Sequence, residues 1–378
     1  MNVLFLDQFS DLGGAQLCLL DLVPAAQAEG WNVSCAVPGR GRLVDKLHAR
    51  GVTVHSLPVT HLASGHKSLR ESLRFARETP KLVREIRRLA EETRPDLLYV
   101  NGPRLLPAAA WVARRTGRPL VFHCHNHLAQ RSAAIVAGRA LQLARARVIA
   151  CCRYVARPLW PYVDPGRLRV IYNGVAAPNG VHAANTGGPR IGVVGRISPE
   201  KGQAEFLEAA RIVVQKHPAA KFLICGAPLF SDAAAERYSA RLRELSSGLP
   251  AEFTGWQEDV NAILAQLDVL VVPSLREPGA PRVVLEAFAA RVPVVAFVSG
   301  GIPEVVTHNK TGFLIEPPTA DALAAKLATL LDESGELHAA AGRAHEAWKE
   351  NFTLERYQRE VLEVIGLTQT RSATGRSI

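Results

Sequence analysis

The chain has 378 residues, of which 48% are hydrophobic and 21% charged, a composition that excludes a disordered protein and is typical of soluble globular ones. This length fits two domains of ordinary size, and no apolar run reaches the roughly 20 residues that a membrane-spanning helix needs. The net charge of +10 is uneven, because residues 1–180 hold 25 Lys and Arg against 12 Asp and Glu, which predicts an anionic partner for the first half.

Short apolar runs rich in Val, Ile and Leu alternate with amphipathic helical stretches along nearly the whole chain. This alternation is typical of parallel sheets covered by helices on both faces. The first set of strands is expected at 2–7, 32–37, 52–57, 96–100, 119–124, 147–151 and 168–171. The second set is expected at 190–195, 220–225, 251–254, 268–272, 292–297 and 312–315. The predicted fold class is α/β, with two Rossmann-like, doubly wound parallel-sheet domains that face each other across a cleft.

A stretch of small residues, Gly and Pro interrupts the pattern at 176–189 and is interpreted as an interdomain linker. The chain opens directly on a strand, so no secretory signal is expected. A late amphipathic helix is expected over 340–365. The predicted organisation is an N-terminal domain at 1–178, a linker at 179–189, a C-terminal domain at 190–350, a helix at 351–366 that packs back on the N-terminal domain, and a flexible tail at 367–378.

The six cysteines lie in apolar contexts, without the C-x-x-C spacing of zinc or redox sites. We expect them to be small buried hydrophobes in a reducing cytoplasm.

Two motifs follow the first strand of each half. Gly13-Gly14 lets backbone approach a ligand at a helix N-terminus, which favours anions, although a plain tight turn explains it equally well. Arg196 and Lys201 lie between strand 190–195 and a helix expected at 202–215. Two cations at the carboxyl end of a strand form a site for a diphosphate; the alternative is two solvated surface charges.

The segment 268–306 is the most informative. A buried strand leads into a Gly/Pro loop that carries Glu277, and the following helix carries Glu286 near its start. An unpaired carboxylate is costly in the apolar stretch around Glu286, so we expect it to bind hydroxyls such as those of a ribose. The next strand ends in Gly300-Gly301, whose amides would lie at another helix start.

Taken in order, these motifs resemble those of the family-4 retaining glycosyltransferases, or glycosyl transferases group 1, which have the GT-B fold. The resemblance covers roughly residues 1–366. It rests on Gly13-Gly14-Ala15-Gln16, on Val170 to Val175, on Gly195-Arg196-Ile197 with Lys201-Gly202, on Phe253-Thr254-Gly255-Trp256 with Asp259-Val260, on Pro273-Ser274, on Glu286-Ala287, and on Gly301 with Pro303-Glu304.

The resemblance implies a retaining hexosyltransferase that moves a sugar from a UDP- or GDP-linked donor to an acceptor, in cell-surface polysaccharide or glycolipid synthesis. It makes 1–178 the acceptor-side domain and 190–350 the donor domain. The implied catalytic residues are His125, which would lie beside the reacting sugar, together with Arg196, Lys201 and Glu277. The implied donor-binding residues are Gly13, Gly14, Arg196, Lys201, Glu286, Gly279, Ala280, Gly300 and Gly301.

Two departures separate this chain from the family pattern. Eight residues, rather than the usual seven, separate Glu277 from Glu286, and Pro-Gly-Ala-Pro replaces the usual Gly-Phe-Gly. The altered spacing is the one feature that favours a catalytically degenerate GT-B scaffold. The other competing function is a sugar-nucleotide epimerase on the same fold. A nucleic-acid binder would explain the basic half, but the chain has no interleaved aromatics or known binding motif.

The sequence His123-Cys124-His125-Asn126-His127 raises the question of a metal site, because alternate residues of a strand share a face. The segment is expected to leave its strand near His125, and no carboxylate follows nearby, so a polar wall of the active site is the favoured interpretation. The chain has no Asp-x-Asp pair. We therefore expect no metal and no cofactor, with Arg196, Lys201 and helix dipoles neutralising the diphosphate.

Seven cations recur at spacings of three and four residues, which places them on one stripe of a helix. They are Lys67, Arg70, Arg74, Arg77, Lys81, Arg84 and Arg88. Pro80 is expected to kink this helix or to start a second one. The stripe predicts a cytoplasmic protein with peripheral contact to the anionic inner face of the membrane. The alternative is a solvated helix laced by the pairs Glu71–Arg74, Glu78–Lys81 and Glu85–Arg88.

Overall fold

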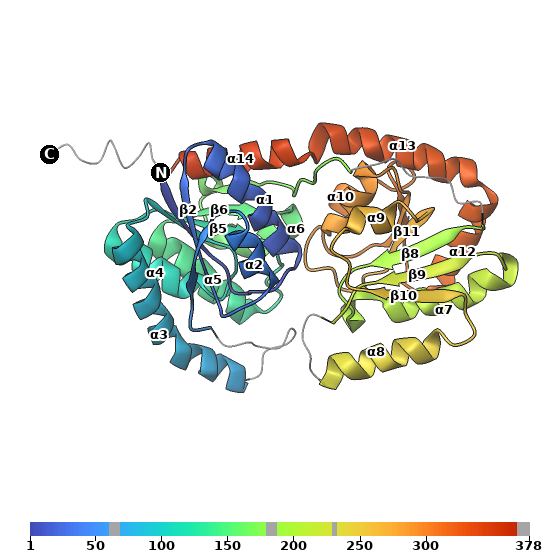
Figure 1. The fold of residues 1–378 in the computed structure, drawn as a ribbon, viewed down its shortest axis with the longest axis horizontal. Helices are drawn as coiled ribbons and strands as arrows, with labels where there is room; N and C mark the ends of the chain where they lie inside the picture. The colour runs from blue at the N-terminus through green and yellow to red at the C-terminus, as the bar shows by residue number, and fades with distance from the viewer. Residues whose placement is uncertain (60–68, 179–186, 229–232, 369–378) are drawn as a thin grey trace. The chain divides into compact units, whose positions relative to one another are not determined.

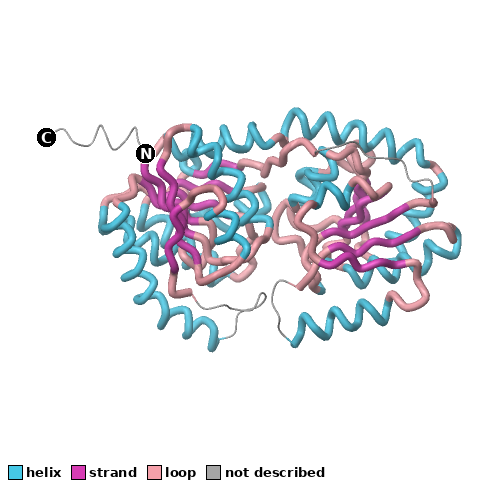
Figure 2. Tube along the Cα trace, viewed as in Figure 1, coloured by secondary structure: helices cyan, strands magenta, loops and turns pink. Residues whose placement is uncertain are grey.

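The structure is a computed structural model that describes residues 1–59, 69–178, 187–228 and 233–368. The chain divides into two compact units (Figure 1): Met1–Tyr172 with the segment from Arg356 onward, and Asn173–Glu355. In each unit a parallel sheet is flanked by helices (Figure 2).

The first unit contains a seven-stranded sheet in the order β3-β2-β1-β4-β5-β6-β7. Its strands are β1 Asn2–Leu6, β2 Asn32–Val37, β3 Thr53–Ser56, β4 Leu97–Val100, β5 Leu120–Cys124, β6 Arg147–Ala150 and β7 Leu168–Val170. Its helices are α1 Gly14–Ala28, α2 Arg42–His48, α3 Leu69–Thr93, α4 Leu106–Thr116, α5 Arg131–Ala144 and α6 Arg153–Ala156, with 3₁₀ turns at Arg157–Tyr162 and Pro165–Arg167. The central strands read as continuous apolar runs because helices cover both faces, so Phe5, Tyr99 and Phe122 are fully buried.

The second unit contains a six-stranded parallel sheet in the order β10-β9-β8-β11-β12-β13. Its strands are β8 Arg190–Val194, β9 Lys221–Cys225, β10 Ala251–Gly255, β11 Val269–Val272, β12 Val294–Phe297 and β13 Phe313–Ile315. Its helices are α7 Gln203–Lys216, α8 Ala233–Leu245, α9 Val260–Leu264, α10 Arg282–Ala289, α11 Ile302–Val305, α12 Ala320–Asp332 and α13 Ser334–Asn351, with a 3₁₀ turn at Pro199–Lys201. Its core forms where Phe206 of α7 packs on Phe222 of β9 and on the strands beside it.

The predicted α/β class with two parallel-sheet, Rossmann-like domains is confirmed, and each expected strand is present with ends within two residues of the prediction. All six cysteines are free and buried, as expected for small apolar side chains. Most of the predicted linker and tail, residues 179–186 and 369–378, lies outside the described residues. None of the helices that the structure describes has the length and apolar character needed to cross a membrane.

The single helix expected over 340–365 is wrong. Two helices, α13 and α14 (Leu354–Gly366), are separated at Phe352 and Thr353. There the chain becomes extended because Val175 pairs with it: the Val175 amide donates to Phe352 O at 3.0 Å and the Leu354 amide donates to Val175 O at 3.1 Å. A strand-like contact with a distant residue thus ends a helix that local sequence would have continued.

From Arg356 onward, α14 belongs to the first unit and lies beside α1 (Figure 1). Tyr357 is fully buried, and its hydroxyl donates to the carbonyl of Cys18 at 3.5 Å. Gln358 Nε2 donates to the carbonyl of Asp21 at 2.6 Å. These contacts anchor the end of the described chain on the helix that follows β1.

Of the two alternatives expected for Pro80, the start of a second helix is not found, since α3 runs continuously from Leu69 to Thr93 with Pro80 inside it. Leu82, Ile86 and Leu89 recur on one face of α3 and are buried. Burial of this face stabilises the helix beyond the residue where proline removes a backbone hydrogen bond.

Candidate functional site

Each sheet has one point where the strand order reverses, and in open α/β sheets ligands bind outside the carboxyl ends of the strands at such a point. In the second unit this point lies between β8 and β11, because the chain proceeds from β8 to β9 and β10 on one side and then returns to β11 on the other. A small cavity lies there, lined by residues that include Gly195, Lys201, Pro273 and Ser274. The loops after β8 and β11 therefore meet at the expected ligand position.

The ion pair between Lys201 and Glu277 joins these two loops. Lys201 Nζ lies 2.6 Å from Glu277 Oε2, and the Glu277 side chain is only 4% exposed. Gly202 makes the close approach possible: its φ is +72°, and a Cβ there would lie 1.9 Å from the carbonyl oxygen of Pro273. Two residues predicted for the donor site are thus brought together.

Arg196 lies in the same loop as Lys201 and forms an ion pair with Glu200. Burial favours a raised pKa for Glu200, but a backbone hydrogen bond and the charge of Arg196 outweigh it and hold this pKa below its usual value. Glu200 therefore stays ionised and orients the guanidinium. The Glu200 carbonyl also accepts from the amides of Leu275 and Arg276, at 3.0 and 3.2 Å.

The turn after β12 is locked to the loop that carries Glu277. The Glu277 amide donates to Ser299 Oγ at 2.8 Å. Gly300 has φ of +55°, and a Cβ there would lie 2.1 Å from the Glu277 carbonyl oxygen. The Gly301 amide donates to the Gly279 carbonyl at 2.9 Å, so it holds the two loops together. Helix α11, which follows Gly301, is a single turn.

Glu286 lies in the second turn of α10 rather than near its start. Its Oε1 accepts from Arg282 Nε at 2.8 Å, and both side chains are about 15% exposed. This carboxylate therefore has a cationic partner, which the apolar surroundings in the sequence did not reveal. Ala280, in the loop before α10, is buried.

The first unit has its reversal point between β1 and β4, and polar residues follow both strands directly. Asp7 comes after β1 and Asn101 after β4, and both are buried. Asn101 Nδ2 donates to Asp7 Oδ2 at 2.6 Å. Gly13 and Gly14 open α1 beside them, with Gly13 in an extended conformation at the N-cap. Of the predicted catalytic and donor-binding residues, the structure thus places Gly13, Gly14 and His125 in this unit and the others in the second.

The three histidines after Phe122 have separate partners. His123 Nδ1 lies 2.5 Å from the hydroxyl of Tyr99, His125 Nε2 lies 2.8 Å from Asn101 Oδ1, and His127 Nδ1 lies 2.8 Å from the carbonyl of Tyr154. The rings of His123 and His125 lie in contact, with centroids 3.9 Å apart and planes tilted by 34°. Burial lowers the pKa of His125 to about 3 and that of His123 well below its usual value, so both are neutral. In the described part of the chain, no group of three or more His, Cys, Asp or Glu side chains is placed to hold a metal ion.

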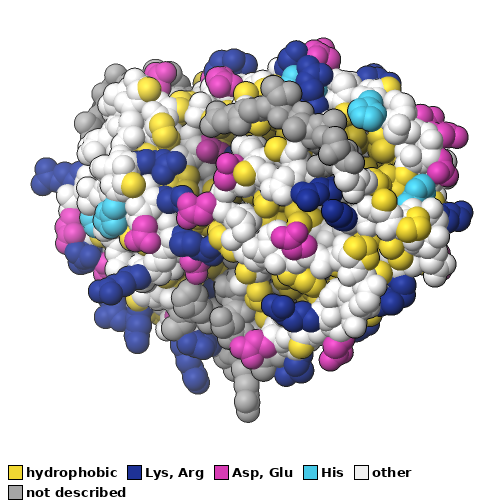
Figure 3. Space-filling view, turned by 45° about the vertical axis from the view of Figure 1, so that its right-hand side comes forward, with side chains coloured by type: hydrophobic (Ala, Val, Ile, Leu, Met, Phe, Trp, Pro, Cys, Tyr) yellow, Lys and Arg dark blue, Asp and Glu magenta, His cyan; other side chains and the backbone are white. Residues whose placement is uncertain are grey.

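The basic stripe lies on α3, apart from Lys67, which lies outside the described residues; the Arg70 side chain is also not described. Arg74 pairs with Glu78, and Arg88 pairs with Glu85 and Glu92. Of the expected pairs, the structure can test Glu78–Lys81 and Glu85–Arg88. Only Glu85–Arg88 is found, since Glu78 pairs with Arg74 instead of Lys81. Arg77, Lys81 and Arg84 are exposed, and within the described ranges no ion pair engages them. On the face drawn in Figure 3, basic and acidic side chains are interspersed.

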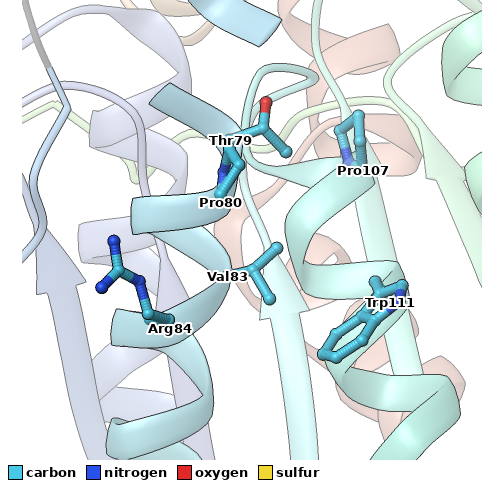
Figure 4. A pocket seen from close by; sticks show the side chains of 6 residues that line it. All are labelled: Thr79, Pro80, Val83, Arg84, Pro107 and Trp111. Carbon is cyan, nitrogen blue, oxygen red and sulfur yellow. The ribbon is translucent and has the colours of Figure 1, made fainter. Parts of the chain in front are cut away.

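A hollow of about 340 Å³ lies between α3 and α4. Val83 points from α3 toward Pro107 and Trp111 of α4, whereas the guanidinium of Arg84 points away from them (Figure 4). Trp111 is 36% exposed, and the guanidinium of Arg115 lies 5.0 Å from the centre of its ring. An apolar hollow with an exposed tryptophan is thus bordered by cations.

Sequence reasoning did not single out Glu200, Arg282, Asp7 and Asn101. For Asp7 and Asn101 a usable signal exists, because each is a polar residue directly after a buried parallel strand. Arg282 lies four residues before Glu286 in α10, a spacing that brings side chains together on a helix. Glu200 lies four residues after Arg196 in the loop that follows β8.

Two family models match the chain. The one described as Glycosyltransferase Family 4 matches residues 12–177, and the one described as Glycosyl transferases group 1 matches residues 179–348. The two matches follow one another along the chain and together span most of it.

Among curated proteins, the chain is 36% identical over 170 residues to the GDP-mannose-dependent monoacylated alpha-(1-6)-phosphatidylinositol monomannoside mannosyltransferase of Corynebacterium glutamicum, covering 42% of each chain. It is 30% identical over 186 residues to the UDP-Gal:alpha-D-GlcNAc-diphosphoundecaprenol alpha-1,3-galactosyltransferase of Escherichia coli, covering 46% of this chain and 47% of that one. The matched segments thus span less than half the length of these relatives.

Among solved structures, Anabaena Alr3699/HepE in complex with UDP-glucose matches with a TM-score of 0.82 and 23% identity, over 97% of this chain and 99% of that one. This likeness concerns the fold, which is shared over nearly the full length.

Proposed function

The chain belongs to the glycosyltransferases of group 1 and family 4, and on that premise we propose that it transfers a sugar, with retention, from a nucleotide-diphosphate donor to an acceptor. The observation that carries the proposal is the placement of Arg196 and Lys201 where the strand order of the second sheet reverses. Each cation is held by a carboxylate of its own, Glu200 or Glu277. Cations held in place before the substrate arrives stabilise charge without reorganisation.

Arg196 and Lys201 would act on the leaving group. When the bond between the anomeric carbon and the phosphate oxygen breaks, negative charge grows on the nucleoside diphosphate. Lys201 has three N–H donors, and its contact with Glu277 uses one of them. The remaining donors and the guanidinium of Arg196 stabilise the growing charge. The acceptor hydroxyl attacks on the face that the diphosphate leaves, and its proton passes to the departing phosphate oxygen, which gives retention.

Glu286 would bind the donor ribose, with Arg282 as its positioning partner. Arg282 uses Nε for Glu286 at 2.8 Å. This contact fixes one carboxylate oxygen and leaves the other to accept from ribose hydroxyls. The proposed donor is UDP- or GDP-linked, since the names of the two relatives contain GDP-mannose and UDP-Gal. We propose that no metal takes part, because the two cations serve the diphosphate.

The proposed acceptor is lipid-linked, because the names of both relatives contain a lipid-linked glycan. We also propose peripheral attachment of the first unit to an anionic membrane surface, which would bring the chain to such an acceptor. Arg77, Lys81 and Arg84 supply exposed positive charge on α3, and each such cation near an anionic surface is worth about 1 kcal/mol. Trp111 in the hollow between α3 and α4 supplies a side chain of the type enriched at membrane interfaces.

The experiment that tests this function is a thermal-shift screen of the purified chain against UDP- and GDP-sugars. A ligand that binds the native state raises the unfolding midpoint by mass action, so a concentration-dependent rise with one donor is expected. No rise with any nucleotide sugar would contradict the proposal. Radiolabelled donor, incubated with and without an acceptor lipid, separates transfer from epimerisation, because an epimerase converts the donor without an acceptor.

A further inference from the structure

We propose that Asp7 and Asn101 are positioning residues that hold the imidazole of His125 in one tautomer, with the proton on Nε2 and the lone pair of Nδ1 available to a sugar hydroxyl. This inference rests on the proposed glycosyl transfer and adds two residues to it. All three residues belong to the first unit and follow adjacent strands β1, β4 and β5.

The orientation of the Asn101 amide follows from its partners. Nδ2 lies 2.6 Å from Asp7 Oδ2 and 3.1 Å from the carbonyl oxygen of Ala15. A carboxylate and a carbonyl only accept hydrogen bonds, so both contacts require the NH₂ group on that side. The Oδ1 atom therefore points to the remaining partner, His125 Nε2, at 2.8 Å.

The tautomer of His125 follows from the amide. Because Asn101 Oδ1 only accepts, His125 Nε2 must carry the proton and donate it. Burial keeps the ring neutral by lowering its pKa to about 3, so Nδ1 carries no proton. Among the described residues, His125 Nδ1 has no hydrogen-bond partner, and the residue is only half-buried. A hydroxyl is the substrate group that donates to such a nitrogen.

Asp7 is itself firmly held. Its carboxylate accepts from Gln16 Nε2 at 3.0 and 3.1 Å and from the Phe9 amide at 2.9 Å. Gln16 lies in the first turn of α1, two residues after Gly14. Buried, fully satisfied networks of this kind are rigid. The carboxylate thus fixes the amide, and the amide fixes the imidazole, with no freely rotating group between them.

The carbonyl of His125 is held as well, since it accepts from the Cys151 thiol at 3.4 Å. His127 is expected to have the opposite tautomer and serves as an internal reference. Its Nδ1 lies 2.8 Å from the Tyr154 carbonyl, which only accepts, so the proton of His127 lies on Nδ1. One chain therefore contains two neighbouring histidines whose expected tautomers differ.

The test is long-range ¹H–¹⁵N NMR of ¹⁵N-histidine-labelled full chain at pH 7.5, with the His125 signals assigned by their loss in His125→Gln. We expect the Nε2–H form for His125 and the Nδ1–H form for His127. In Asn101→Ala, His125 should become a mixture of tautomers while His127 stays unchanged. The turnover number should fall on the order of tenfold, the effect of one lost hydrogen bond, and the affinity for the free nucleoside diphosphate should not change.

Asn101→Asp is the matched variant. Two adjacent carboxyls share one proton, so a protonated Asp at this position donates to Asp7 and accepts from Nε2, as the amide does. It should keep the His125 tautomer. The proposal is overturned if wild-type His125 is Nδ1–H or doubly protonated, or if Asn101→Ala leaves its tautomer intact. Expected tautomers without any detectable sugar transfer would instead refute the proposed function and leave the positioning pair standing.

Discussion

Lys201 Nζ and Glu277 Oε2 lie 2.6 Å apart although the two residues are 76 positions apart in the sequence. The pair connects the loop after β8 with the loop after β11, and the Ser299 hydroxyl fixes the backbone of Glu277 from the turn after β12. Three loops at one end of the sheet thus meet at Glu277, one through its carboxylate and one through its backbone. This arrangement gives Glu277 a role in holding the cation of Lys201.

Glu277→Gln tests that role. The amide has the shape of the carboxylate but no charge, so Lys201 loses its orienting partner while the loop keeps its packing. We expect the turnover number to fall on the order of tenfold to a hundredfold, with an unchanged circular dichroism spectrum. The control is Glu244→Gln, on the exposed face of α8, which should have wild-type kinetics. Wild-type turnover of Glu277→Gln would show that the ion pair is only a loop contact.

Glu286→Ala tests the ribose contact. The substitution removes the proposed acceptor and also the partner of Arg282, so binding of UDP or GDP should weaken on the order of tenfold to a hundredfold. Titration calorimetry with the free nucleotide measures this without requiring an acceptor. Arg282→Ala should weaken binding less, because it leaves the carboxylate in place. Equal affinities of wild type and Glu286→Ala would remove Glu286 from the site.

The strands and the fold class were predictable because strands buried on both faces produce apolar runs that stand out from amphipathic helices. The position of Arg196 and Lys201 in the loop after β8 was also predictable, because that loop follows such a run. Their role in binding the donor stays a prediction. The partners Glu200 and Arg282 were overlooked, although each lies four residues from the cation or carboxylate that it holds. The pairing of Lys201 with Glu277 was not accessible, because it depends on which loops the sheet order brings together.

The C-terminal helices show a second limit of prediction from the sequence. Nothing in the composition of 340–365 requires a break, and the break arises because Val175 pairs with residues 352 to 354. Pro80 shows the reverse case, in which a local helix breaker is accommodated because α3 buries Leu82, Ile86 and Leu89. In both cases tertiary contacts override the local preference.

Asp7 makes stability depend on pH in an unusual direction. Burial raises its pKa to about 6, whereas an unfolded Asp titrates near 3.9. The folded state therefore binds the proton more readily, so this residue adds stability below pH 4 and loses that contribution as pH rises to 6. The difference amounts to roughly 3 kcal/mol. Cys35, which faces Asp7 from β2, has a raised pKa and stays neutral in this range.

Urea unfolding of wild type and Asp7→Asn at several pH values between 4 and 8 measures this contribution. The free energy of unfolding of wild type, relative to that of Asp7→Asn, should decrease from pH 4 to 6 and then stay constant. Parallel pH profiles for the two proteins would show that Asp7 titrates normally.

Membrane attachment is tested by co-sedimentation with vesicles. We expect the chain to pellet with anionic but not with neutral vesicles at low salt, and to be released at high salt. Reversal of Arg77, Lys81 and Arg84 to Glu should abolish binding. The control reverses Lys216, Arg237 and Arg241, three exposed cations of the second unit, with the same change in net charge. Equal binding of the two triple variants would show that only net charge matters.

We propose that Arg196 and Lys201, rather than a metal ion, stabilise the leaving diphosphate. The most direct measurement is the initial rate of sugar transfer in excess EDTA, with the donor found by thermal shift, for wild type, Arg196→Ala and Lys201→Ala. Wild-type turnover should persist in EDTA, and each variant should lose on the order of a hundredfold or more in turnover, as expected for an electrostatic contact that strengthens in the transition state. Loss of wild-type activity in EDTA with rescue by Mg²⁺, or full turnover in both variants, would contradict the account.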